Sequence, residues 1–139
     1  MYCIMNRFLL NNIGDRDHKT IYSPLSKHAI FDCSPTQLGW EHYKDIRIGD
    51  HVFIIDSSRQ VSKEFRVTMI ADEVALKGDC WGEFESVTGG DARVLFGVLV
   101  SEPKVAYGDF VLEHSIKYGK KFNPVTGKLT SPGFNCCKF

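Results

Sequence analysis

The clearest pattern along the chain is a run of four apolar residues from Val52 to Ile55, entered through the dipeptide Gly49-Asp50. An apolar run without polar alternation is typical of a strand that is buried on both faces or that closes a barrel. After a polar connection, the segment from Glu64 to Ala71 alternates between apolar and polar residues, which is the period of a half-buried strand. The two segments together predict a β-hairpin.

Other segments also have the composition of regular elements. We expect strands at Tyr2 to Leu10, at Arg93 to Val100 and, as one or two strands, within Val105 to Leu112, while Ala29 to Phe31 fits either a short strand or a helical fragment. A Ser-Pro pair predicts a short helix from Pro35 to about Lys44, because serine can cap the first amides and proline suits the first helical position.

The remaining segments are richer in turn residues. Glu73 to Gly90 is expected to be a long acidic connection, and residues 119–139 an ordered, loop-like tail. Four aromatic residues are the expected anchors of that tail: Tyr118, Phe122, Phe134 and Phe139. The elements predict an α+β, mostly β fold, namely a small antiparallel β-barrel with one or two short flanking helices, which forms a single domain over residues 1–139.

Composition agrees with one globular domain, because 139 residues with 43% hydrophobic and 24% charged content can bury a core. Seventeen basic residues balance seventeen acidic ones, so a polyanion would have to bind a local patch. The charges are unevenly spread: six acids lie from Asp72 to Asp91, and five lysines with no acid lie from His114 to the end. This asymmetry predicts a charged partner, or a homodimer in which the acidic loop of one copy meets the basic tail of another. The alternative is that the two are solvated surface segments of opposite sign that attract each other.

Five scattered cysteines without a secretory segment indicate a cytoplasmic protein with reduced thiols. No apolar run approaches the roughly 20 residues that span a bilayer, so no membrane partner is expected. The cysteines and histidines lack metal-ligand spacing, so we predict neither a metal nor a cofactor. His28 and Cys33 lie close in sequence, but no complete catalytic motif is present. A non-catalytic protein is the favoured interpretation, with a small-molecule-binding barrel or a small enzyme with a Cys/His site as the alternative.

The segment from Trp40 to Glu73 resembles a known family. A tryptophan in a short helical segment, then Ile48-Gly49-Asp50, then a strand ending in Asp56-Ser57-Ser58 and a returning strand, is similar to the PUA-like superfamily and within it to the EVE-type domain. In such a turn, glycine lets the chain bend tightly and aspartate can accept hydrogen bonds from backbone amides. The resemblance implies a β-barrel with flanking helices that reads a modified base of DNA or RNA in an aromatic pocket.

A base-reading pocket requires flat aromatic faces, hydrogen-bonding groups and cations for phosphate. The first two could come from Trp40, Tyr43, Ser57, Ser58 and Trp81. The cations could come from Arg59, Lys117, Lys120 and Lys121. We therefore predict nucleic-acid binding in a cleft between the Trp40 helix and the hairpin. The competing interpretation is that Trp40 and Tyr43 are core residues. Trp81, flanked by Cys80 and Gly82 in a polar loop, is expected to be a lid or a partner contact, with a core position as the alternative.

Overall fold

The fold is described from a computed structural model of the chain. The structure describes residues 5–11, 21–33, 39–56, 58–72, 76–79, 82–84, 93–116, 123, 125–127 and 136–139. Within these residues the chain is mostly β, with two helices. The strands are β1 (Arg7–Asn11), β2 (Ile21–Ser23), β3 (His28–Cys33), β4 (His51–Ile55), β5 (Gln60–Asp72), β6 (Leu76–Asp79), β7 (Gly82–Phe84), β8 (Arg93–Ser101), β9 (Val105–Ala106) and β10 (Cys136–Lys138). The helices are α1 (Trp40–Tyr43) and α2 (Tyr107–Glu113).

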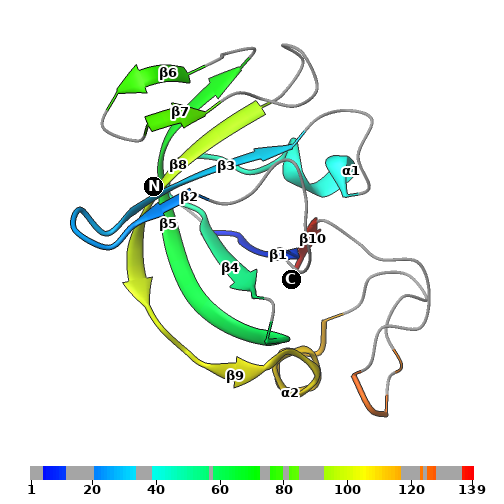
Figure 1. Cartoon of the computed structure of the whole chain (residues 1–139). Coiled ribbons are helices and arrows are strands. Elements are labelled where there is room, and N and C mark those ends of the chain that lie inside the picture. The colour runs from blue at the N-terminus through cyan, green and yellow to red at the C-terminus, as the bar shows by residue number, and fades with distance from the viewer. Residues whose placement is uncertain are drawn as a thin grey trace.

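One strongly curved sheet organises the molecule (Figure 1). Its strands follow the order β10-β1-β4-β5-β8-β3-β2, and β9 pairs with the start of β5. All pairs are antiparallel except β1–β4, which is parallel. Strands β6 and β7 form a separate two-stranded sheet. In the part of the chain that the structure describes, the large sheet is not closed, so the mostly β class is confirmed and a barrel is not.

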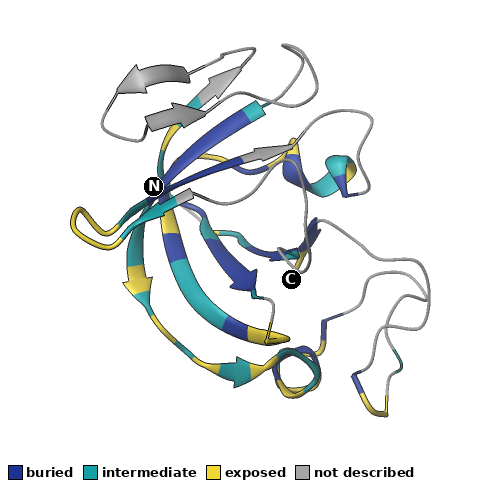
Figure 2. Ribbon diagram, in the orientation of Figure 1, coloured by how far each residue is buried: buried dark blue, intermediate teal, exposed yellow. Residues whose placement is uncertain are grey.

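Buried residues lie along β3, β4 and β8 (Figure 2). With buried residues of β1 and other elements they form two clusters, one on each face of β1 and β4. The α1-side cluster contains Val52 and Ile54 of β4 together with Tyr43 of α1. The α2-side cluster contains Phe53 and Ile55 of β4 together with residues of α2. Alternate residues of a strand point to opposite faces, so all four apolar positions of β4 are buried. This arrangement confirms the prediction of a strand buried on both faces.

The predicted hairpin is confirmed, because β4 pairs antiparallel with β5. The returning strand is longer than its alternating segment, spanning 13 residues from Gln60 to Asp72. It pairs with β4 over its first part and with β8 along most of its length, through bulges at two points on the β8 side. Of the two alternatives for Ala29 to Phe31, the strand is correct, since all three residues belong to β3.

Several predicted elements differ in type or extent, among them the first strand, which begins at Arg7. Val105 to Leu112 forms a two-residue strand followed by α2, because Tyr107, Phe110 and Val111 follow helical spacing and pack into the α2-side cluster. Of the helix predicted from Pro35, the described part is α1, which starts at Trp40 after Gly39 with φ 93°, a value that a right-handed helix does not contain. Residues 34–38 lie outside the described part of the chain. The acidic connection contains β6 and β7.

The C-terminal segment is also more regular than predicted. Cys136–Lys138 is a strand, β10, which pairs antiparallel with β1. Phe139 packs against the α2-side cluster, as expected of an anchor. The other predicted anchors, Tyr118, Phe122 and Phe134, lie outside the described residues. Among the described helices, neither has the length and apolar character needed to cross a membrane.

Candidate functional site

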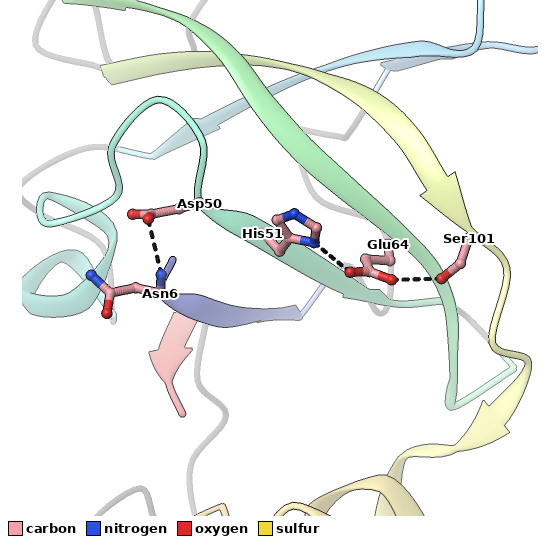
Figure 3. Close-up of polar contacts among 5 residues, drawn as sticks. All are labelled: Asn6, Asp50, His51, Glu64 and Ser101. Carbon is pink, nitrogen blue, oxygen red and sulfur yellow. Dashed lines mark hydrogen bonds and ion pairs between the residues drawn. The ribbon is translucent and has the colours of Figure 1, made fainter. Parts of the chain in front are cut away.

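A buried aspartate fixes the start of β4. Gly49 adopts φ 94°, and its amide donates to the Val67 carbonyl at 2.8 Å. Asp50 is only 4% exposed, and its two carboxylate oxygens accept hydrogen bonds from the backbone amides of Asn6 at 3.1 Å and Arg47 at 2.8 Å. The expectation that this aspartate binds backbone amides is confirmed. The carboxylate joins the segments that enter β1 and β4 (Figure 3).

The next residue, His51, stands in the middle of a cross-strand row. Its register partners are Arg7 on β1 and Arg66 on β5. Directly paired residues of neighbouring strands lie on the same face of a sheet, and Phe53 assigns this face to the α2 side. We call Arg7, His51 and Arg66 the basic row. The Arg7 guanidinium lies over the ring of Phe139, 4.8 Å from its centroid, and Arg66 is exposed.

Glu64 of β5 orients the imidazole of His51. The Nδ1 atom of His51 donates a hydrogen bond to the Oε2 atom of Glu64. The Ser101 hydroxyl on β8 donates to the other oxygen of Glu64 at 2.7 Å. Figure 3 shows the three side chains in line, with Glu64 between His51 and Ser101. The side chains of His51 and Glu64 are 16% and 17% exposed, so the pair is shielded but can be reached.

This arrangement determines what the imidazole can offer to a ligand. A carboxylate oxygen accepts, so Nδ1 carries the proton, and Nε2 lies on the other side of the ring (Figure 3). Within the described part of the chain, Nε2 has no hydrogen-bond partner. The two guanidinium groups and one carboxylate give the site one net positive charge when His51 is neutral and two when it is protonated. Such a site suits an anion. The described residues contain no group of three metal-ligating side chains.

The structure places the predicted aromatic residues mainly in the core. Tyr43 is 1% exposed, and its hydroxyl donates to the Arg93 carbonyl at 3.0 Å. Trp40 is half-buried, packs against the α1-side cluster and stacks on Tyr43 with ring centroids 6.3 Å apart. This placement matches the competing interpretation for Tyr43, which offers no open ring face. Trp40 keeps exposed surface, and its role in base binding stays a prediction.

The predicted cleft is not assembled by the residues that can be placed. The Tyr43 hydroxyl bonds to Arg93, and Arg93 pairs with Asp72, the last residue of β5. Arg59 lies at the opposite end of the same strand, directly before its first residue, Gln60. Thirteen strand residues at about 3.3 Å each separate these ends by about 40 Å of chain. Figure 1 shows the hairpin end beside α2, far from α1.

Of the other residues predicted to contact nucleic acid, two are exposed and the rest lie outside the described part of the chain. Ser58 and Arg59 are exposed in the turn, and the Arg59 carbonyl accepts from the Tyr107 amide at 3.0 Å. Trp40 and this turn therefore do not form one pocket. The remaining predicted residues lie outside the described part of the chain: Ser57, Trp81, Lys117, Lys120 and Lys121.

The two described C-terminal thiols do not supply a nucleophile. Cys136 and Cys137 are fully buried and not in a disulfide. Burial raises the pKa of Cys137 from 9.0 to about 12, against a smaller lowering by a backbone hydrogen bond from Leu9. A thiol with this pKa stays protonated at neutral pH, and the thiolate is the reactive form. Cys137 therefore does not support the alternative of a Cys/His site.

Comparison with family models, with curated proteins and with solved structures found no match to this chain. The site is therefore defined by its own geometry. Sequence reasoning missed its five members, which come from four strands: Arg7, His51, Glu64, Arg66 and Ser101. A partial signal was present, because Glu64 and Arg66 alternate with apolar residues on the polar face of the returning strand. The partners of that face depend on strand register, which the alternation does not specify.

Proposed function

We propose that the protein is a non-catalytic nucleic-acid-binding domain that contacts the phosphate backbone through the basic row. The observation that carries this proposal is the register of Arg7, His51 and Arg66 across three adjacent strands. Arginine is a common phosphate ligand, because its planar fork of donors matches the phosphate oxygens. Neighbouring strands lie about 4.8 Å apart, so the row presents cationic groups in a line across the sheet.

The local arrangement accounts for binding by a chain of zero net charge. A polyanion needs a patch, and the row concentrates positive groups on the α2 side of the sheet. Glu64 offsets part of that charge, but its carboxylate is already engaged by His51 and Ser101. Arg66 is exposed and free to reach a phosphate, and Arg7 is held in place over Phe139.

Base reading is the finer part of the proposal. The similarity to the EVE-type domain of the PUA-like superfamily suggests a modified base as the ligand, and Trp40 is the described aromatic residue that could stack on it. Helix α1 contacts β10, and β10 pairs with β1, which carries Arg7. A single strand that crosses the β10 edge of the sheet would therefore meet both Arg7 and Trp40. Along this path, Trp40 would stack on a base while Arg7 contacts the phosphate backbone of the same strand.

The decisive experiment is the salt dependence of oligonucleotide binding, measured by fluorescence anisotropy from about 50 to 200 mM salt. The wild-type protein should bind single-stranded DNA or RNA and lose affinity steeply as salt rises. Arg66→Gln should lower the slope of the log–log plot by about 0.7 to 1, since one phosphate contact is lost. Lys44→Gln removes the same charge from exposed α1-side surface and should leave the slope unchanged. Absence of binding at the lowest salt would overturn the proposal.

One observation favours a second candidate, a site for a small anionic molecule. An imidazole held by a carboxylate is also the arrangement of a general base, and His51 is held in this way by Glu64. A small phosphate ester would bind with little salt dependence and compete poorly with an oligonucleotide spread over the row. Binding of inorganic phosphate as tight as that of an oligonucleotide would favour this candidate. The alternative of self-association stays a prediction, since most of the acidic loop and basic tail lies outside the described residues.

A further inference from the structure

We infer that His51 is a proton-linked phosphate contact, so that nucleic-acid binding at the basic row takes up a proton. This inference rests on the proposed function and specifies how that same site is regulated. It is carried by the geometry of three side chains. His51 lies between two arginines in register, and its Nδ1 is bound to Glu64. The ligand class is a phosphate oxygen of a nucleic acid.

The hydrogen-bond network determines which imidazole nitrogen meets the ligand. Glu64 accepts from Nδ1, and Ser101 holds the other carboxylate oxygen at 2.7 Å. The carboxylate is therefore fixed from two sides, and the ring cannot turn Nδ1 outward without losing its partner. Nε2 is the nitrogen left to meet a phosphate (Figure 3). Glu64 is a positioning residue in this scheme, and it does not contact the phosphate.

Protonation reverses the interaction between Nε2 and an anion. In the neutral ring, Nε2 carries a lone pair, which repels a phosphate oxygen. In the protonated ring, Nε2 carries a hydrogen and donates a charge-assisted bond to that oxygen. A ligand that binds the protonated form better must, by linkage, promote uptake of a proton. Binding should therefore strengthen as the pH falls through the range in which imidazole titrates.

Among the described residues, three charged side chains pair with His51 or bond to it across the sheet. Arg7 comes from β1, Glu64 and Arg66 come from β5, and β8 contributes the uncharged hydroxyl of Ser101. The guanidinium groups stay charged at every relevant pH. Directly after α2, His114 contacts Phe139 with centroids 5.4 Å apart, and the Arg7 guanidinium lies over the same Phe139 ring. His114 is therefore the second imidazole whose contribution must be separated from that of His51.

The test measures proton uptake with an oligothymidylate, which lacks bases that titrate in this range. The dissociation constant is followed from pH about 8 to about 5 at constant ionic strength. Calorimetry in two buffers of different ionisation heat counts the protons taken up by the wild-type protein. We expect affinity to rise about tenfold as pH falls, which is within the strength of one charge-assisted hydrogen bond. By linkage, a tenfold rise corresponds to a maximum uptake of about half a proton, reached midway through the rise.

Variants assign the effect to one residue. His51→Gln should keep salt-dependent binding through Arg7 and Arg66 but lose the pH dependence and the proton uptake. His114→Gln is the matched control and should retain both. Glu64→Gln keeps an oxygen that can accept from Nδ1 but removes the negative charge, so it should bind more tightly at high pH.

The possible results separate the two proposals. Absence of binding at every pH would refute nucleic-acid binding itself. Salt-dependent binding without proton uptake in the wild-type protein would refute only the role of His51. A pH dependence that survives in His51→Gln and disappears in His114→Gln would assign the effect to His114 and refute the role of His51. The calorimetric measurement uses the unaltered protein, so the inference can be tested even if a variant unfolds.

Discussion

The carboxylate of Asp50 binds the backbone amide of Asn6, a residue 44 positions earlier in the chain, at 3.1 Å. Its second oxygen binds the Arg47 amide, so one buried side chain satisfies amides of two separate segments. Strands β1 and β4 are parallel and cannot be joined by a tight hairpin. Asp50 links the entry points of both strands. It therefore supports the register that places Arg7 beside His51.

Replacing Asp50 should destabilise the fold strongly. Asp50→Ala removes two hydrogen bonds to a charged acceptor and leaves two amides unpaired, which should cost about 3 to 5 kcal/mol of unfolding free energy. Asp50→Asn keeps one acceptor oxygen and should cost about half as much. Urea denaturation measures the difference. Asp45→Ala, at an exposed position nearby, should change stability by less than about 0.5 kcal/mol. Equal stability of both alanine variants would show that the Asp50 contacts carry no net energy.

The local features of the fold could be predicted from the sequence. The apolar run of β4, the alternation of β5 and the turn chemistry of Gly49-Asp50 depend on residues close together in the chain. Strand β8 was predicted for the same reason. Burial of both faces of β4 also follows from its sequence, although the sequence does not say what covers each face. In the structure, α1 covers one face and α2 the other.

The candidate site could not be predicted, because it depends on pairing between distant segments. Arg7 and His51 are neighbours because β1 and β4 pair in parallel, and β2, β3 and α1 lie between these two strands in the sequence. Ser101 reaches Glu64 next to a bulge between β5 and β8, which local alternation does not predict. Aromatic residues were expected to form the site, but Tyr43 is buried in the α1-side cluster. Helix α2 was missed because Val105 and Ala106 extend the strand pattern just before the helical spacing begins.

Two glycines of similar backbone conformation should respond differently to alanine. Gly39 and Gly49 have φ values of 93° and 94°, so alanine at either position should cost about 1 to 2 kcal/mol of backbone strain. A Cβ at Gly39 would lie 2.4 Å from the Cys136 amide nitrogen, whereas one at Gly49 would meet nothing within 4 Å. Gly39→Ala should therefore cost about 1 to 3 kcal/mol more, as overpacking does. Thermal unfolding of the two variants measures this difference, and similar melting temperatures would contradict the close approach of Gly39 to β10.

The Cys137 thiol should be unreactive in the native state. Burial raises its pKa from 9.0 to about 12, so the folded state favours the protonated thiol. Its stabilising contribution is fully present below pH 9.0 and is lost as the pH rises from there through about 12. Iodoacetamide at about pH 8 should label Cys137 far more slowly in the native protein than in urea, as read by mass spectrometry of the C-terminal peptide. Equal rates in both states would show that this strand opens freely.

Trp40 tests whether base stacking accompanies backbone contact. Its ring is half-buried and supported by Tyr43, so it could stack on a base without first becoming ordered. Trp40→Leu should weaken binding of a single-stranded oligonucleotide by about tenfold, within the 1–3 kcal/mol range of a base–aromatic stack. The salt slope should stay unchanged, because no phosphate contact is lost. The oligonucleotide should also quench tryptophan emission in the wild-type protein more than in this variant, which retains Trp81.

Tyr43→Phe is the control for damage to the core beneath Trp40. It removes only the hydroxyl that donates to the Arg93 carbonyl, so it should cost about 1 kcal/mol of stability and leave oligonucleotide affinity unchanged. If Trp40→Leu also retains full affinity, and quenching is equal in both proteins, Trp40 acts only in packing. Backbone contact at the basic row would then account for binding without any base reading. A loss of affinity and a lower salt slope in Trp40→Leu would instead show that α1 supports the row itself.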